Sequence, residues 1–178
     1  DSKEIIDKVR EDIKRADEEN KRLLEEVRDR IRKLLEENET LLKDSERKAR
    51  ELLEELRRKD SPGVEEVLKR IRKLVEDDKE SVDRSTKTIK KLLKEVEDSV
   101  RESSKEIERL LREVEDIVRK VPEEDLKRLA KEVKDRIREL LERNRELIKE
   151  VEKRVRRLLD ENRKSSEEIR KEVEDRKR

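Results

Sequence analysis

The apolar positions of this chain follow an 18-residue repeat. In the first third of the sequence, Ile6, Leu24 and Leu42 stand at that spacing. Eighteen residues make five turns at 3.6 residues per turn, the natural period of an α-helix, so an apolar stripe with this repeat stays on one face and forces no supercoil. The pattern therefore predicts helices that are long, straight and regular.

The same repeat continues through the rest of the chain. Its clearest members in the remaining two thirds are Ile71, Ile89 and Ile107, followed by Val133, Val151 and Ile169. The chain has no aromatic residue, no Met and no Cys, so the core predicted from this pattern is aliphatic throughout. A composition that is 60% charged and 29% hydrophobic would suit a disordered chain, but disordered chains lack such periodicity. The sequence instead predicts an all-α protein.

Two breaks in the periodicity divide the chain into three helices. The first is the segment 60–63, where Ser61 can cap a helix, Pro62 suits a first helical turn and Gly63 supplies a flexible backbone. The second lies at Pro122, which disfavours helix at the residue before it and fits the first turn of the next helix. We expect helices over about residues 2–59, 62–120 and 123–177.

Loops this short can join only antiparallel neighbours, which determines the order of the predicted bundle. The fold class expected is an elongated antiparallel three-helix bundle that runs up, down and up, as a straight or nearly straight coiled coil with an 18-residue repeat. We expect residues 1–178 to form one domain. One shared apolar seam uses up the apolar residues available, so a monomer is favoured over an assembly and no partner is required.

The charge balance argues against several classes of partner. The chain has 54 basic and 53 acidic residues, and the two signs are mixed along every segment. Nucleic-acid binding needs a basic patch or stacking aromatics, and a transmembrane span needs about 18 consecutive apolar residues. Neither occurs in the sequence, so no nucleic acid and no membrane is expected as a partner, and the protein is expected to be soluble. No targeting signal is visible, and the absence of Cys leaves the localisation unknown.

Polar residues interrupt the apolar stripe at positions that correspond across the three helices. Asn20 and Asn38 are separated by one 18-residue repeat on the first helix, as are Asn144 and Asn162 on the third. Antiparallel pairing through short turns brings residues equally far from a turn to one height, which predicts three levels of polar residues. The first level contains Asn20, Ser103, Ser104 and Asn144, the second contains Asn38, Ser85, Thr86 and Asn162, and the third contains Ser45, Asp78, Ser165 and Ser166.

Two interpretations of these levels are open. Amide and hydroxyl groups both donate and accept, so each level can form a buried hydrogen-bond network that joins the helices. Alternatively, the residues are solvated Ser and Asn on slightly rotated helices. Agreement across three helices favours networks, most clearly for the first two levels. The third level contains Asp78, and a buried carboxylate costs several kcal/mol unless its hydrogen bonds are satisfied.

No residue of the chain is a candidate for catalysis or for metal binding. Adjacent acids such as Glu25 and Glu26 lie on a charged helix surface, without the burial that tunes a general acid. Pairs four residues apart, such as Glu4 with Lys8, support the helices and solubility. The chain has no His, no Cys and no glycine-rich phosphate loop, so we expect no enzyme activity, no metal and no cofactor.

The combination of these features resembles de novo designed, parametrically generated helical bundles with buried hydrogen-bond networks. It consists of equal helices, an 18-residue aliphatic repeat, the Ser61-Pro62-Gly63 loop, a Glu/Lys/Arg surface and the polar levels. The resemblance covers the whole chain and implies a hyperstable scaffold whose networks enforce one register and one oligomeric state. Related designs serve as halves of heterodimers or as cages that hold a displaceable helix. This chain has neither a long flexible linker nor an embedded recognition peptide.

The function expected from the sequence is therefore structural, with no natural biochemical activity. The alternative is an interaction module that accepts a helix from a partner chain in a groove of the bundle, as a component of a heteromer or a switch. A natural spectrin-like spacer would show core aromatics and variable repeat lengths, and both are missing here.

Overall fold

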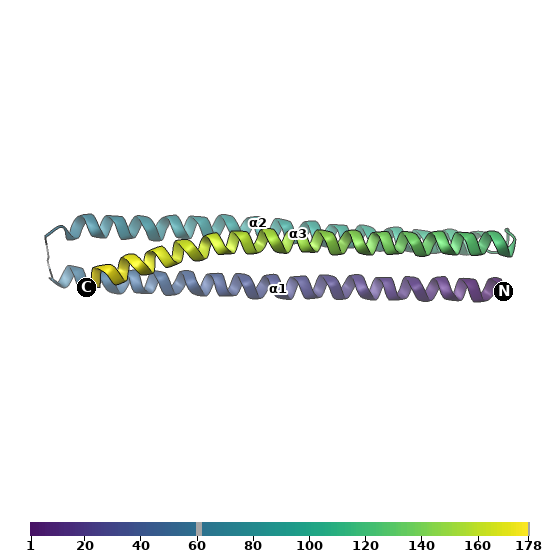
Figure 1. The fold of residues 1–178 in the computed structure, drawn as a ribbon, viewed down its shortest axis with the longest axis horizontal. Coiled ribbons are helices and arrows are strands. Elements are labelled where there is room, and N and C mark those ends of the chain that lie inside the picture. Colours follow the sequence, from purple (N-terminus) through teal and green to yellow (C-terminus); the bar gives the residue numbers. More distant parts are fainter. Residues whose placement is uncertain (60–61, 178) are drawn as a thin grey trace. The chain divides into compact units, whose positions relative to one another are not determined.

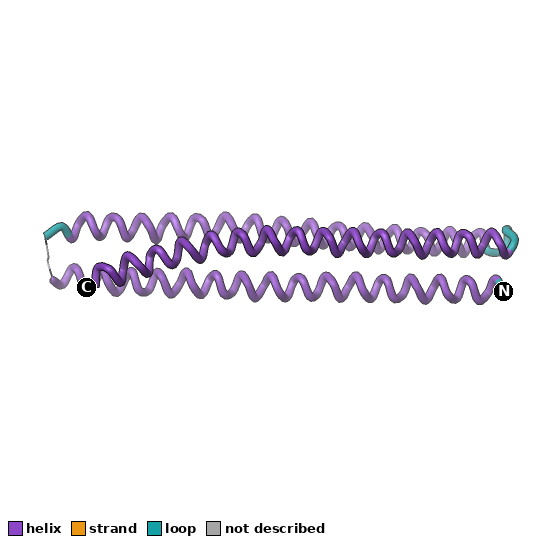
Figure 2. The backbone as a smooth tube through the Cα atoms, in the orientation of Figure 1, coloured by secondary structure: helices purple, strands orange, loops and turns teal. Residues whose placement is uncertain are grey.

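The computed structural model describes residues 1–59 and 62–177. Figure 1 shows its three helices, α1 (Ser2–Lys59), α2 (Val64–Ile117) and α3 (Glu123–Lys177). The described part of the chain consists of helices and short connections, and Figure 2 shows no strand in it. The protein is an all-α three-helix bundle in which each helix packs against the other two.

The helix bounds agree with the sequence prediction at α1 and α3 and differ at α2. Gly63 has a φ of 79°, which is not a helical conformation, so α2 begins only after it and Pro62 lies in the turn instead of the predicted first helical turn. The predicted cap at Ser61 lies outside the described residues. At its other end α2 stops at Ile117 because the chain must reverse within a few residues, and the Lys120 N–H donates to the Ile117 carbonyl at 2.9 Å.

The contacts of the chain group into two compact units, and every helix contributes a segment to both. Unit 1 consists of residues 1–29 and 92–152, and unit 2 consists of residues 30–91 and 153–178. The connection between α2 and α3 belongs to unit 1, and the connection between α1 and α2 belongs to unit 2. The single domain expected over residues 1–178 stays a prediction.

In unit 1 the helix segments run up, down and up. The segments of α1 and α2 are antiparallel, because Arg10 pairs with Glu115 at 3.1 Å while Arg28 pairs with Glu97 at 3.0 Å. The α3 segment follows α2 through a short connection and returns alongside it. The buried residues of the main core cluster are all aliphatic, and they are Ile6, Val9, Ile13, Ala16, Ile107, Val114, Leu126, Val133, Ile137, Leu140 and Leu141.

Unit 2 has the same order of helix segments. Glu46 of α1 lies 3.8 Å from Lys79 of α2, and Glu172 of α3 lies 3.3 Å from Arg70 of α2. The aliphatic core continues the 18-residue stripe of the sequence. Its main cluster contains the buried residues Ala49, Leu52, Ile71, Ile169 and Val173.

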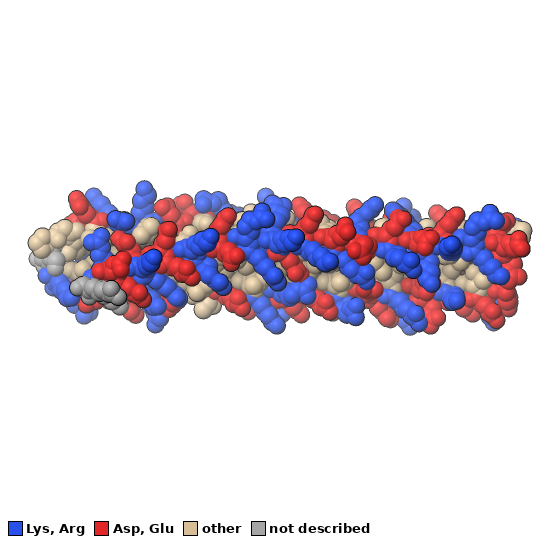
Figure 3. All heavy atoms as spheres, in the orientation of Figure 1, with Lys and Arg blue, Asp and Glu red and all other residues tan. Residues whose placement is uncertain are grey.

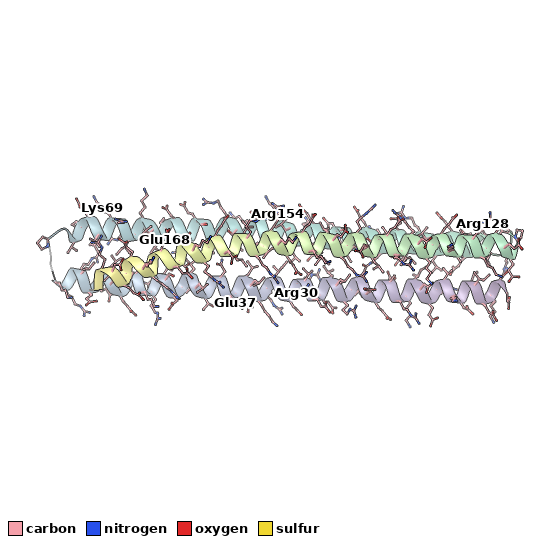
Figure 4. The ribbon with its side chains drawn as sticks, viewed as in Figure 1. Arg30, Glu37, Lys69, Arg128, Arg154 and Glu168 are labelled. Carbon is pink, nitrogen blue, oxygen red and sulfur yellow. The ribbon has the colours of Figure 1, made fainter. Side chains whose placement is uncertain are left out.

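Charged side chains cover the surface of both units. On the face shown in Figure 3, Lys and Arg are interspersed with Asp and Glu. Arg154 and Glu168 of α3, labelled in Figure 4, are among these exposed charges. Among the described residues no large hydrophobic side chain is exposed, and none of the described helices is long and apolar enough to cross a membrane. The candidate functional site is therefore sought among the polar residues buried between the helices.

Candidate functional site: polar layers in the core

Nine polar residues are buried within the helix packing of the described chain. All nine belong to the polar levels predicted from the sequence, and they are Asn20, Asn38, Ser45, Asp78, Ser85, Ser103, Asn144, Asn162 and Ser166. The other three residues of these levels, Ser104, Thr86 and Ser165, are half-buried at the edge of the core. Whether buried residues act together depends on the hydrogen bonds among them.

The first layer lies in unit 1 and consists of Asn20, Ser99, Ser103 and Asn144. Asn144 lies at its centre, and its Nδ2 donates to Asn20 Oδ1 and to Ser103 Oγ, each at 3.1 Å. Asn144 Oδ1 accepts from Ser99 Oγ at 2.8 Å. Ser103 Oγ donates to the carbonyl oxygen of Ser99 at 2.9 Å. Asn144, on α3, is thus hydrogen-bonded to both α1 and α2 at one height.

The two asparagines of this layer differ in how fully they are bonded. An amide side chain offers two N–H donors and one acceptor oxygen, and all three groups of Asn144 have partners although the residue is only 1% exposed. Asn20 accepts one hydrogen bond, and its Nδ2 is buried without a partner among the described residues. A buried donor without a partner costs about 1–3 kcal/mol. The first layer therefore leaves the side-chain Nδ2 of Asn20, on α1, without a hydrogen-bond partner among the described residues.

Ser104 belongs to the predicted first level but bonds elsewhere. Its hydroxyl hydrogen-bonds the carboxylate of Asp17, a half-buried residue of α1. Burial raises the pKa of the Asp17 carboxyl, Glu108 adds to this rise, and Lys21 and Ser104 oppose it. Asp17 Oδ1 is buried and has no partner within the described ranges. A carboxylate that the apolar periodicity did not single out thus borders the first layer.

The second layer lies in unit 2 and consists of Asn38, Ser81, Ser85 and Asn162. Ser81 Oγ donates to Asn162 Oδ1 at 3.0 Å, and Ser85 Oγ lies 3.4 Å from the same oxygen. Asn38 and Asn162 are both buried, yet the Nδ2 of each has no partner in the described chain. Thr86, predicted for this level, donates to a carbonyl of its own helix at 2.8 Å. The layer therefore joins α2 to α3, and the hydrogen bond expected from Asn38 is not formed.

The third layer also lies in unit 2 and consists of Ser45, Asp78 and Ser166. Ser166 Oγ donates to Asp78 Oδ2 at 3.0 Å. Ser45 Oγ donates to a carbonyl of its own helix at 2.9 Å and lies 3.4 Å from the carbonyl oxygen of Ser166. Among the described residues, Ser165 forms a side-chain hydrogen bond only within its own helix, at 3.3 Å. A carboxylate on α2 thus meets a hydroxyl on α3 inside the core.

The environment of Asp78 disfavours its charged form. The residue is 2% exposed, and its Oδ1 has no partner among the residues described. Burial raises the pKa of the Asp78 carboxyl because the ionised group loses its hydration. The hydrogen bond from Ser166 opposes this rise, and the negative charge of Glu46 adds to it. The contribution of Asp78 to stability therefore depends on pH.

The sequence prediction omits Ser81 and Ser99, although these two residues make the shortest hydrogen bonds to Asn162 and Asn144. A signal for them was present in the sequence. Each stands four residues before a predicted serine of α2, and residues four apart share one face of a helix. The prediction followed only those polar residues that interrupt the apolar stripe, so serines next to the stripe were missed.

Two ion pairs hold α1 and α3 in the same alignment as the layers. In unit 1, Arg145 pairs with Glu19, and these residues directly follow Asn144 and precede Asn20 in the sequence. In unit 2, Arg170 pairs with Asp44. Partly exposed pairs contribute up to about 1 kcal/mol each, so they support the alignment without deciding it.

The chemistry available in the layers is hydrogen bonding. The described residues contain no group of three or more His, Cys, Asp or Glu that could hold a metal ion. Each bonded amide or carboxylate of the layers meets its partners from the neighbouring helix at one height. Comparison of the chain with protein-family models, with curated proteins and with solved structures finds no match in any of the three.

Proposed function

We propose that this chain is a structural scaffold, a helical bundle of the de novo designed type, whose buried polar layers specify the register and the oligomeric state of its helices. The observation that carries the proposal is Asn144. This residue is buried and is hydrogen-bonded to Asn20 on α1 and to Ser99 and Ser103 on α2. The proposal includes no enzymatic activity.

Register needs specification in this chain because its apolar stripe repeats. A helix that slides by one 18-residue repeat keeps its apolar side chains in the core, so apolar burial distinguishes such registers only weakly. A slide of α3 in one direction brings Leu126 to the height of Asn144. Asn20 and Ser99 would then be buried against a side chain that cannot hydrogen-bond, at about 1–3 kcal/mol for each unpaired group. The polar layer thus penalises a register that the apolar stripe permits.

The proposal is tested by removing the first layer in part and in whole. Asn144→Leu alone leaves Asn20, Ser99 and Ser103 without their partner, and we expect it to lower the free energy of unfolding by about 1–3 kcal/mol. A quadruple variant converts both asparagines to Leu and both serines to Ala. It leaves no polar side chain of the layer behind, so we expect it to be at least as stable as the original chain. Light scattering should show a broader mass distribution for it, since a uniformly apolar seam permits other registers and associations.

Ser165→Ala is the matched control for these variants. In the described part of the chain the Ser165 hydroxyl donates only to a carbonyl of its own helix, so its loss should change neither the stability nor the mass distribution. A harmless Asn144→Leu change, together with a quadruple variant that is neither more stable nor more heterogeneous, would show that the layer does not specify register. The scaffold proposal would then be wrong.

A second candidate function is the binding of a partner helix between α1 and α3 in unit 2. It is favoured by Asn38, which is 5% exposed, has an Nδ2 without a partner among the described residues, and borders a hollow of about 130 Å³. Leu34, Leu41 and Leu159 line the same hollow, as does Glu37, which is labelled on α1 in Figure 4. A helix with a carbonyl or hydroxyl oxygen at this height would supply the acceptor that Asn38 lacks.

Light scattering of the isolated chain over a range of concentrations separates the two candidates. A mass that stays that of one chain, and that Asn38→Leu leaves unchanged, supports the scaffold. Self-association that Asn38→Leu abolishes supports the helix-binding function, because that variant removes the open donor while it keeps an apolar side chain at the position.

A further inference from the structure

A hollow of about 290 Å³ lies between α1 and α3 in unit 1. Its apolar floor consists of Ala16 of α1 together with Ile137 and Leu141 of α3, which are 2%, 6% and 9% exposed. No residue of the three polar layers lines it. The hollow is therefore a separate feature of the structure, with a floor built from the aliphatic core.

The small side chain of Ala16 accounts for the size of this hollow. The residues that share its phase in the 18-residue repeat are Leu34 and Leu52. In unit 2 a hollow lined by Leu34 and Leu159 measures about 130 Å³, less than half as much, and Leu159 is the repeat counterpart of Leu141. An isobutyl group thus fills space at Leu34 that the methyl group of Ala16 leaves open.

The rim of the hollow carries an excess of positive charge. Four basic and two acidic residues line it, and one of the acids, Glu19, pairs with Arg145. The other acid is Asp12 of α1. Lys134 and Arg138, which are one turn apart on α3, have no acidic partner in the described part of the chain. Two uncompensated cations therefore border an apolar floor.

We propose that this hollow binds a small organic anion, with an aromatic or short aliphatic body and one carboxylate or sulfonate group. The body contacts Ala16, Ile137 and Leu141, and removal of its apolar surface from water drives binding. The anionic group lies between Lys134 and Arg138, where the guanidinium offers parallel N–H donors and the ammonium offers a point charge. This ligand site is independent of the scaffold function proposed above.

Naphthalene-2-carboxylate is the probe for this site. The chain has no aromatic residue, so the fluorescence of the probe is read without a protein background. We expect saturable binding at one site per chain, weakened by added salt because the cations are exposed. The neutral analogue naphthalene-2-methanol should bind several-fold more weakly, since it pairs with neither cation.

Three variants locate the binding. Ala16→Leu places at residue 16 the side chain that the repeat has at Leu34, and it should weaken probe binding by about tenfold or more while the helical content stays the same. Joint replacement of Lys134 and Arg138 by Gln should remove the preference for the anion over the neutral analogue. Lys131→Gln is the matched control, because Lys131 is an exposed cation of α3 that does not line the hollow, and it should leave binding unchanged.

Three results would overturn the proposal. They are no saturable binding to the unaltered chain, equal binding by Ala16→Leu, and equal affinity for the anion and its neutral analogue. If Ala16→Leu disturbs the helical content, the Lys134 and Arg138 replacements decide alone, because both side chains are exposed and lie outside the core. None of these results affects the layer experiments, so failure of this site leaves the scaffold proposal standing.

Discussion

Asn144 Nδ2 donates a hydrogen bond to Asn20 Oδ1 across 3.1 Å, which joins two asparagines that are 124 residues apart in the chain. The two residues are unequal partners. Asn144 also bonds Ser99 and Ser103, whereas Asn20 has only this one bond and a buried Nδ2 without a partner among the described residues. Loss of Asn144 therefore leaves more polar groups without a hydrogen-bond partner than loss of Asn20 does.

We expect Asn20→Leu to be less damaging than Asn144→Leu. It should lower the free energy of unfolding by about 1 kcal/mol or less, against about 1–3 kcal/mol for Asn144→Leu. Removal of the unpaired donor of Asn20 offsets part of the lost bond. Denaturant unfolding followed by circular dichroism measures both values. Equal costs would show that Asn144 is not the centre of the layer.

The hydroxyl of Ser99 should contribute measurably to stability, although the sequence prediction did not include it. Ser99→Ala removes the 2.8 Å hydrogen bond to Asn144 Oδ1, and we expect a loss of about 0.5–1.5 kcal/mol in denaturant unfolding. Thr88→Ser keeps a hydroxyl that bonds within its own helix and serves as the control on α2. A Ser99→Ala variant as stable as the control would mean that another group satisfies Asn144.

Asp78→Asn should stabilise the protein at neutral pH and lose this advantage in acid. The folded-state pKa of Asp78 lies above its ordinary value of 3.8, because burial disfavours the carboxylate. The free-energy cost of burying the Asp78 carboxylate is therefore absent below pH 3.8, where the carboxyl is protonated in both the folded and the unfolded chain. This cost develops as the pH rises through the folded-state pKa. Asparagine carries no such penalty, so the stability difference between variant and original should grow from acid towards neutral pH.

Unfolding midpoints in denaturant at several pH values test this dependence. At pH 7 we expect Asp78→Asn to be more stable than the original chain, because burial raises the pKa of the Asp78 carboxyl and so disfavours its charged form. Asp77→Asn is the matched control, since Asp77 is the exposed neighbour in the sequence and its replacement should have little effect at any pH. A constant difference between the Asp78 variant and the original chain across the pH range would contradict the role given to burial.

Gly63 should be the least replaceable residue of the described turn between α1 and α2. Its φ of 79° lies in the left-handed region, where a side chain costs about 1–2 kcal/mol. A Cβ at Gly63 would meet no other atom within 4 Å, so the cost of Gly63→Ala comes from the backbone alone. Gly63→Asn should cost less, because Asn adopts this region more readily. Equal unfolding free energies for both variants would contradict this account.

Much of this fold could be predicted from the period of the sequence. Ile71, Ile89 and Ile107 recur with the 18-residue period, and each is 1% exposed or less. The same period marks Asn20 and Asn144 as inward-facing polar residues. These predictions succeed because the direction in which a residue faces depends only on its angle around a helix of known pitch.

The partners of the buried polar groups could not be predicted in this way. Ser99 bonds Asn144 while Ser104, which the pattern favoured, does not. Asn20 accepts a hydrogen bond from Asn144, but Asn38, its counterpart one repeat later, forms no such bond. Which of these hydrogen bonds form depends on side-chain rotamers and on small rotations of each helix. The spacing of residues along the sequence contains no information on either.

The sequence by itself determined three helices, aliphatic cores and the heights of the polar residues, because these follow from the helical period and from turn-forming residues. Only the tertiary structure decided which polar groups meet and which stay unpaired. It also decided that Ala16 leaves a hollow between α1 and α3, where its repeat counterpart Leu34 borders a smaller one. These outcomes depend on distances between helices, which are set by how unlike side chains pack against one another.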